Sequence, residues 1–310
     1  MSADAASTRR GMAWAFTGSA MAAAFMIPWK YASGHGEPRM AVLVLLTTAA
    51  ALNTGLALVT ARRRGGGGPG ASWAATWGLA VAFAVLTLLG NRASAESVAL
   101  ISGALLAVVQ RCEVILVALM GAFFLREHVR PPFWLGTLVA GAGLWILQRP
   151  GPAGADFEPM GAVWGLGSAA CFGAMVVLSR RYITRVHVLP LNAIRLWMSV
   201  GLWFLMERHL PTADDLPVGL VLGAALAGFF GPFLSRLSIL QSARHVPAAS
   251  TALAGLATPA LTLLLALVVL GNLPTRHELL GGAIMLAGIA IPLTATARAR
   301  RIAATSAARS

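Results

Sequence analysis

The sequence predicts an all-α integral membrane protein whose ten transmembrane helices form two inverted five-helix repeats. The composition, the spacing of apolar segments and the similarity of the two halves lead to this prediction. Of the 310 residues, 57% are hydrophobic and 11% are charged, whereas a soluble domain is about a quarter charged. A membrane-spanning helix needs roughly 20 mainly apolar residues. Segments of that kind follow one another along the chain and leave little sequence for a soluble domain.

The predicted helices are apolar segments separated by short connections rich in Gly, Pro or Arg. They cover residues 11–30, 39–61, 72–91, 98–124, 131–148, 160–180, 188–207, 217–240, 247–270 and 277–296. We divide the chain into a cytoplasmic N-terminal segment (1–10), a first repeat (11–148), a linker (149–159), a second repeat (160–296) and a basic cytoplasmic tail (297–310).

The basic residues predict that both termini are cytoplasmic. If the N-terminus is inside, 16 of the 24 Lys and Arg residues fall on the inner side and 6 on the outer side, with Arg111 and Arg195 inside helices. An excess of Lys and Arg marks the cytoplasmic loops of membrane proteins. The same distribution explains the net charge of +13 without nucleic-acid binding. Arg9 and Arg10 before an apolar segment also fit a signal peptide, but that segment has a counterpart in the second half.

The two halves of the chain resemble each other. A shift of 145 residues aligns Gly136 with Gly281 and Gly143 with Gly288, and a shift of 150 aligns Trp14 with Trp164. Because each half holds an odd number of helices, the second half enters the membrane upside down. This is the inverted-repeat plan of many secondary transporters, which bind their solutes near the membrane midplane.

The segment HVPAASTALAGLATPALTLLLALVVLGNLPTRHELLGGAIMLAGIAI (245–291) and its counterpart, residues 95–146, resemble the EamA-type exporters of the drug/metabolite transporter superfamily. The resemblance covers nearly the whole chain and implies the five-plus-five architecture. The chain departs from the family pattern at two places. Glu113 and Val114 stand where the second half has the expected proline, Pro259, and the closing acidic residue is Glu127 in the first half but Asn272 in the second.

Gln110, Arg111 and Glu113 lie near the middle of the predicted helix 98–124, close to the bilayer centre. A charged residue there costs roughly 2.5–3.5 kcal/mol on insertion scales, so two of them together indicate a function. Gln110 and Glu113 are three residues apart and share a helix face, whereas Arg111 points elsewhere. We expect this face to line a polar cavity in which Glu113 exchanges a proton and a solute in turn.

Two further arginines, Arg195 and Arg236, are candidate partners of Glu113. The alternative is a buried ion pair that only locks helices together. Arg236 lies near the end of its predicted helix, where a long side chain can instead extend to the membrane surface.

Trp14 and Trp164 are predicted to contact the solute, because they occupy equivalent places in the helices that the resemblance assigns to the central cavity. The alternative is that they anchor helix ends at the membrane surface. Pro232, Pro259 and the neighbouring Thr258 are predicted hinge or cavity positions, since a proline inside a helix frees backbone carbonyls.

The sequence contains no nucleotide-binding loop, metal-ligand motif or catalytic constellation, so we expect no cofactor and no enzymatic activity. Together with the resemblance, this indicates a secondary transporter of a bacterial inner membrane. It would export a small metabolite, such as an amino acid, or an amphipathic drug by alternating access. Its partners would be the solute and membrane lipids, and a homodimer stays open. A lipid-handling protein or enzyme and an accessory membrane subunit are the alternatives.

Overall fold

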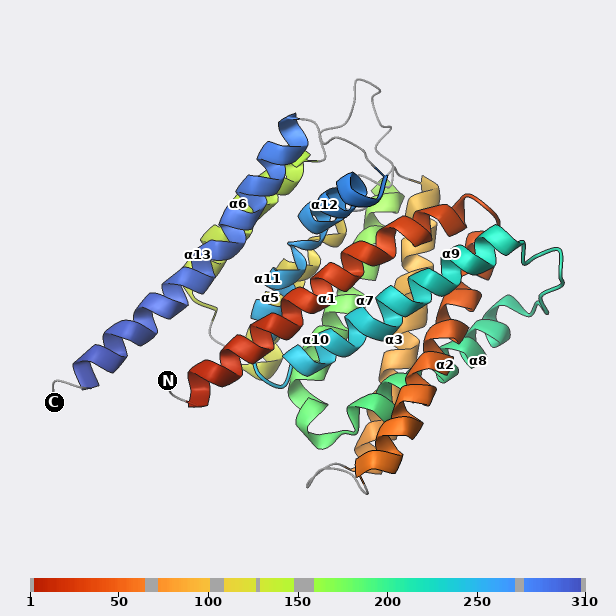
Figure 1. Cartoon of the computed structure of the whole chain (residues 1–310), viewed down its shortest axis with the longest axis horizontal. Coiled ribbons are helices and arrows are strands. Elements are labelled where there is room, and N and C mark those ends of the chain that lie inside the picture. The colour runs from red at the N-terminus through yellow and green to blue at the C-terminus, as the bar shows by residue number, and fades with distance from the viewer. Residues whose placement is uncertain are drawn as a thin grey trace.

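The computed structural model describes residues 3–64, 72–100, 109–126, 129–147, 159–270 and 276–307. These residues form helices joined by short connections, and no strand occurs within these ranges (Figure 1). The first half contains α1 (Ala3–Ser33), α2 (Pro38–Arg64), α3 (Trp73–Leu100), α5 (Glu113–Leu125) and α6 (Pro131–Leu147). The second half contains α7 (Pro159–Tyr182), η1 (Ile183–Arg185), α8 (Val188–Glu207), α9 (Val218–Gly228), η2 (Phe229–Ser235), α10 (Arg236–Ser242), α11 (Ala248–Gly255), α12 (Thr258–Leu270) and α13 (Arg276–Ala307).

The helices are long and apolar enough for a membrane protein. Six helical segments in the described ranges can cross a membrane by length and composition: Ala6–Trp29, Arg39–Thr60, Trp73–Ser94, Pro159–Arg185, Val188–Glu207 and Val218–Ser242. Shorter apolar helices cover Glu113–Leu125, Pro131–Ile146 and Leu279–Pro292. The all-α fold class is therefore confirmed.

Several helix boundaries differ from the prediction. The predicted helix 98–124 is not one helix, because α3 continues to Leu100 and a turn at Arg111 and Cys112 precedes α5. Helix α1 begins at Ala3, inside the predicted N-terminal segment, and α13 continues to Ala307, through most of the predicted tail. Both extensions are rich in Ala and Arg, which are strong helix formers.

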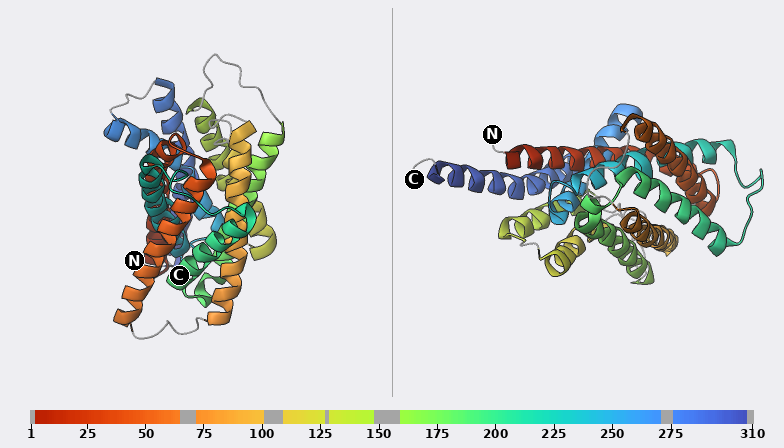
Figure 2. Two further views of the ribbon diagram at one scale, coloured as in Figure 1. Left: turned by 90° about the vertical axis from the view of Figure 1, so that its right-hand side faces the viewer. Right: turned by 90° about the horizontal axis from the view of Figure 1, so that it is seen from below.

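Helices of the two halves pack against each other in a symmetric pattern. Helix α1 contacts α9 and α10, and α7, the equivalent of α1, contacts α3, the equivalent of α9 and α10. In addition, α2 contacts α8, α5 contacts α11, and α6 contacts α13. Exchanging the two halves interchanges the first two contacts and returns the α2–α8 and α6–α13 pairs to themselves. Figures 1 and 2 both show α6 and α13 running side by side at the edge of the bundle.

The crossing of α6 and α13 depends on glycines. A Cβ atom on Gly136 would lie 2.6 Å from the carbonyl oxygen of Gly288, and one on Gly143 would lie 2.6 Å from that of Gly281. A Cβ atom on Gly288 would likewise meet the backbone of Ala140. Small residues let membrane helices approach this closely. Gly136 thus faces Gly288 and Gly143 faces Gly281, so each glycine lies opposite the repeat counterpart of the other.

Contacts between helix ends define two faces of the bundle. At the first, which we call the N-terminal face, Ser7 Oγ lies 3.1 Å from His245 Nδ1. There Arg181 Nη1, in α7, also donates to the carbonyl of Phe124 in α5 at 2.9 Å. At the opposite face, Arg92 of α3 pairs with Glu207 of α8 at 3.0 Å.

Replacing Gly143 with leucine should destabilise the protein, because the new side chain would meet the backbone of α13. Overpacking of this kind costs about 1–3 kcal/mol. Gly141 lies in the same helix with nothing within 4 Å of its Cβ position, so Gly141→Leu is the matched control and should leave the unfolding temperature of the purified protein unchanged. Equal losses in both variants would contradict this description of the crossing.

Candidate functional site

The chain is interrupted between Gln110 and Glu113. Val109 and Gln110 are helical, Arg111 and Cys112 form a turn, and α5 begins at Glu113. Across the turn, Cys112 N donates to the carbonyl of Val109 at 3.0 Å and Val114 N to that of Arg111 at 3.1 Å. These hydrogen bonds span three residues, whereas those of an α-helix span four. Gln110 therefore lies directly before the turn and Glu113 begins α5 after it, and their common face stays a prediction.

The second half is interrupted at the equivalent position. Helix α11 ends at Gly255, Leu256 and Ala257 form a turn, and α12 begins at Thr258. Leu256 N donates to the carbonyl of Leu253 at 3.1 Å and Ala257 N to that of Ala254 at 3.0 Å. Thr258 corresponds to Glu113 under the shift of 145 residues that aligns the two halves. The two halves therefore share a broken helix at the same position of the repeat.

The two interruptions meet inside the bundle. Arg111 Nη1 donates to the carbonyl of Gly255 at 3.2 Å, and Ser19 Oγ donates to that of Ala254 at 2.9 Å. The last carbonyls of a helix have no partner within it and need donors from elsewhere. Arg111 Nε is buried and has no hydrogen-bond partner among the described residues. Arg111 thus links the two repeats and keeps a donor for another group.

Glu113 lies among arginines. Its carboxylate is attracted first by Arg111 and then by Arg236, and Arg236 in turn repels Arg195. In the described part of the chain, no ion pair of 4.0 Å or less joins Glu113 to an arginine. The four side chains therefore form a loose group of three guanidinium groups and one carboxylate, which we call the central charge group.

Neutral polar side chains hold Arg195 in place. It is 2% exposed, and it donates from Nε to Asn192 Oδ1 at 2.6 Å and from Nη1 to Thr87 Oγ1 at 2.8 Å. Asn192 Nδ2 donates to Asn53 Oδ1 at 2.7 Å and to the carbonyl of Pro232 at 3.2 Å. This network joins α2, α3, α8 and η2, so Arg195 is positioned by amides and a hydroxyl.

The segment before Arg236 is a π-helix. It covers Phe229–Ser235 and contains Pro232. Short π-helical segments occur frequently at functional sites, and proline removes one backbone donor. Arg236 follows directly and is half-buried, and Glu113 is the acidic residue that acts on its charge. Its role as a partner of Glu113 stays a prediction.

The remaining predicted residues lie at the edge of this group or outside it. Gln110 Nε2 donates to Ser94 Oγ at 3.1 Å and Ser168 Oγ at 3.5 Å, which ties it to α3 and α7. Trp14 and Trp164 are 40% and 42% exposed, and the described residues include no hydrogen bond or ring contact from either to the central charge group. Their contact with a solute therefore stays a prediction.

Thr258 and Pro259 begin α12. The predicted helix 247–270 is interrupted directly before Pro259, which follows the turn at Leu256 and Ala257. Pro259 lies in the first turn of α12, where its missing N–H costs no intrahelical hydrogen bond. Glu127, the acidic residue that closes the family pattern, and Asn272, its counterpart, lie outside the described residues.

Three polar residues of the network were not predicted: Asn53, Thr87 and Asn192. They are uncharged and each is common enough in apolar helices to attract no notice singly. What they share in the sequence is a position inside a predicted membrane helix, where a polar side chain indicates a buried contact.

Comparisons with known proteins agree with this architecture. The EamA-like transporter family matches residues 9–149 and 159–294, one match in each half. The chain is 26% identical over 178 residues to the uncharacterized transporter YwfM of Bacillus subtilis (strain 168), covering 54% of this chain and 56% of that protein. It is 23% identical over 176 residues to the uncharacterized transporter YdfC of the same organism, covering 56% of each. The chain thus spans about half the length of the curated relatives it matches.

A solved crystal structure of a protein 19% identical in sequence superimposes with a TM-score of 0.77, over 96% of this chain and 99% of that chain. At this identity the likeness shows the fold alone. The family match extends over both halves, and the two equivalent interruptions and the symmetric helix pairs agree with it. The chain therefore belongs to the EamA-like transporter family, in the drug/metabolite transporter superfamily, as an integral membrane protein of two inverted five-helix repeats.

Proposed function

We propose that this transporter is a secondary exporter of a small metabolite that bears a carboxylate, such as an amino acid, and that it works by alternating access. The observation that carries the proposal is the meeting of two broken helices beside the central charge group. Broken helices at the interface of inverted repeats form the solute sites of many secondary transporters, where free backbone groups and helix ends face the solute.

The charges favour a carboxylated solute. The central charge group holds three guanidinium groups and one carboxylate, and Arg111 Nε is buried without a partner among the described residues. A guanidinium group presents a planar set of donors that matches a carboxylate. An amino acid would place its carboxylate on the arginines and its ammonium group on Glu113. A cationic amphipathic drug would meet the same arginines with the wrong charge.

Glu113 supports proton coupling. A proton and the ammonium group of the solute would compete for the same carboxylate, so that each leaves when the other binds. Such competition exchanges protons for solute, and an inward proton gradient across a bacterial inner membrane would then drive export. The π-helical segment η2 and the two interruptions are places at which helices can bend while the repeats rock about this group.

Both termini should lie in the cytoplasm, as the excess of Lys and Arg on their side requires. Reporter domains fused at Ser310 and inserted at Gly154 should therefore give opposite signals for cytoplasmic and external location in intact cells. The same signal from both positions would contradict an odd number of spanning helices in each half.

Cysteines introduced at Gln110 and at Glu113, in a background without Cys112 and Cys171, should react with a small hydrophilic thiol reagent in membranes. Both native side chains are only half-buried, and the proposed cavity would admit water to them. Val117, one turn further along α5, is fully buried, so a cysteine there is the control and should be protected. Protection at all three positions would favour a dry ion pair.

Glu113→Gln should uncouple transport from the proton gradient, because the amide keeps the size of the side chain but cannot take up or release the proton. Proteoliposomes loaded with a mixture of labelled amino acids would be tested with and without an imposed pH gradient. We expect gradient-driven movement by the unmodified protein and its loss in Glu113→Gln, while the folded yield is kept. The control is Glu207→Gln, the same chemical change in an ion pair at the far end of the bundle.

Two results would contradict this role of Glu113. Unchanged gradient-driven transport by a well-folded Glu113→Gln would exclude it as the coupling residue. Loss of the folded protein would instead indicate a structural ion pair, since removing one partner of a buried pair costs about 3–5 kcal/mol.

A further inference from the structure

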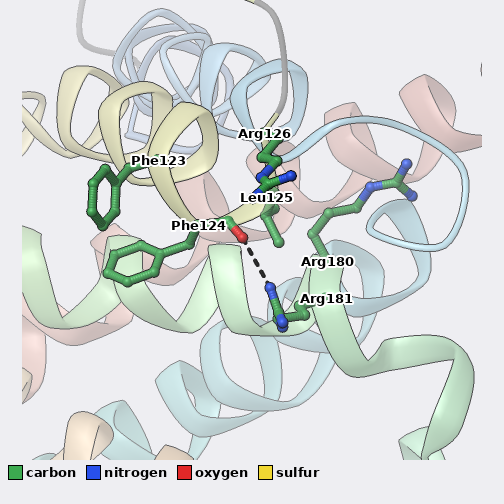
Figure 3. A pocket seen from close by; sticks show the side chains of 6 residues that line it. All are labelled: Phe123, Phe124, Leu125, Arg126, Arg180 and Arg181. Carbon is green, nitrogen blue, oxygen red and sulfur yellow. Dashed lines mark hydrogen bonds between the residues drawn. The ribbon is translucent and has the colours of Figure 1, made fainter.

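An open groove lies at the N-terminal face, where α5 and α7 end. Its volume is about 740 Å³, and it is lined by Phe123, Phe124, Leu125, Arg126, Arg180 and Arg181. Figure 3 shows the two phenyl rings on one side of the groove and the arginines on the other. The groove is separate from the central charge group, because Glu113 starts α5 and the groove lies at its opposite end.

The basic side of the groove is built from arginines, and the described lining residues include no carboxylate. Arg181 Nη1 donates to the carbonyl of Phe124 at 2.9 Å (Figure 3), and Arg180 Nη1 donates to that of Ala243 at 3.0 Å. The bond from Arg181 occupies one of the five N–H donors of its guanidinium group. Arg181 is therefore held in a fixed place while it keeps donors for an anion.

Arg126 reaches the groove through an uncommon backbone conformation. It ends α5 with a φ of 52°, and its N–H donates to the carbonyl of Gly121. A positive φ is unusual for a residue other than glycine. The helix stops here, and the exposed side chain of Arg126 lies beside the groove that α7 borders (Figure 3).

Neighbouring segments add positive charge to this face. Partial burial lowers the pKa of His245, and the charges of Arg10, Arg244 and Arg180 lower it further. Arg10 lies in α1 and Arg180 in the last turn of α7, so these two helices bring positive charge to this face. Positive charge favours an anion at the groove.

The other side of the groove is apolar and open. Phe123 is 79% exposed and Phe124 is 58% exposed, and their ring centroids lie 5.0 Å apart in an edge-to-face arrangement. Both rings stand in the last turn of the apolar helix α5. Their exposed surfaces are suited to lipid chains rather than to water.

We propose that this groove binds an anionic phospholipid, with the phosphate at Arg126 and Arg181 and the acyl chains along Phe123 and Phe124. Basic pockets between transmembrane helices on the cytoplasmic side bind lipid head groups in this way. A free phosphate would use the arginines but not the exposed rings. The alternative is that these arginines only determine how the chain is oriented in the membrane. That role would require neither a groove nor a hydrogen bond that fixes the guanidinium group of Arg181.

The test compares lipid binding by the intact chain and two variants. Delipidated protein in detergent is mixed with phosphatidylglycerol or phosphatidylcholine, and bound lipid is counted by native mass spectrometry. We expect preferential binding of phosphatidylglycerol, and a loss of apparent affinity of about tenfold in the double variant Arg126→Gln, Arg181→Gln. Arg185→Gln is the control, because Arg185 is an exposed arginine of the same face outside the groove.

Two further measurements separate the alternatives. Phe123→Ala should weaken binding of phosphatidylglycerol, and millimolar inorganic phosphate should not displace the lipid. Displacement by phosphate would mean a free-anion site and would overturn the proposal, as would equal losses in the double variant and in Arg185→Gln. Unfolding temperatures of the lipid-free variants show whether each is folded, and if the double variant is not, Arg126→Gln alone provides the comparison.

Discussion

Backbone carbonyls at the end of α11 need hydrogen-bond donors, because the membrane interior holds no water to satisfy them. Arg111 supplies one donor to Gly255, and Ser19 supplies another to Ala254. The arginine comes from the interruption in the first repeat and the carbonyl from the interruption in the second. One side chain therefore stabilises both broken helices, and the position of Glu113 at the start of α5 depends on it.

The remaining contacts fix the frame around this link. Glycines bring α6 and α13 into backbone contact at one edge, while the amide network around Arg195 joins α2, α3, α8 and η2. Both sets of contacts connect the two repeats. Arg111 and Arg195 of the central charge group are held by hydrogen bonds, whereas Glu113 and Arg236 have no side-chain hydrogen bond among the described residues.

Much of the fold could be predicted from the sequence, since span length, apolar composition and paired glycines are local or periodic signals. The interruption at Arg111 and Cys112 could not, because neither residue is a proline or glycine that marks a turn. The interruption in the second repeat lies between Gly255 and Pro259, and this proline is the local signal that predicts it. The contact of Arg195 with Thr87 joins residues 108 positions apart, and no pattern in either helix encodes that distance. The contact of Trp14 and Trp164 with a solute stays a prediction.

The two interruptions share their geometry but differ in chemistry. The first carries Arg111 and Glu113, whereas Leu256 and Thr258 stand at the equivalent places in the second. If the transporter works by the proposed alternating access, identical inverted repeats would give inward-open and outward-open conformations that are related by a two-fold rotation and equal in energy. The charged members belong to one repeat only, so these two conformations would place them differently relative to the membrane and would differ in energy. The empty protein would then have an intrinsic resting orientation, set by the amino-acid sequence before any gradient or solute acts on it.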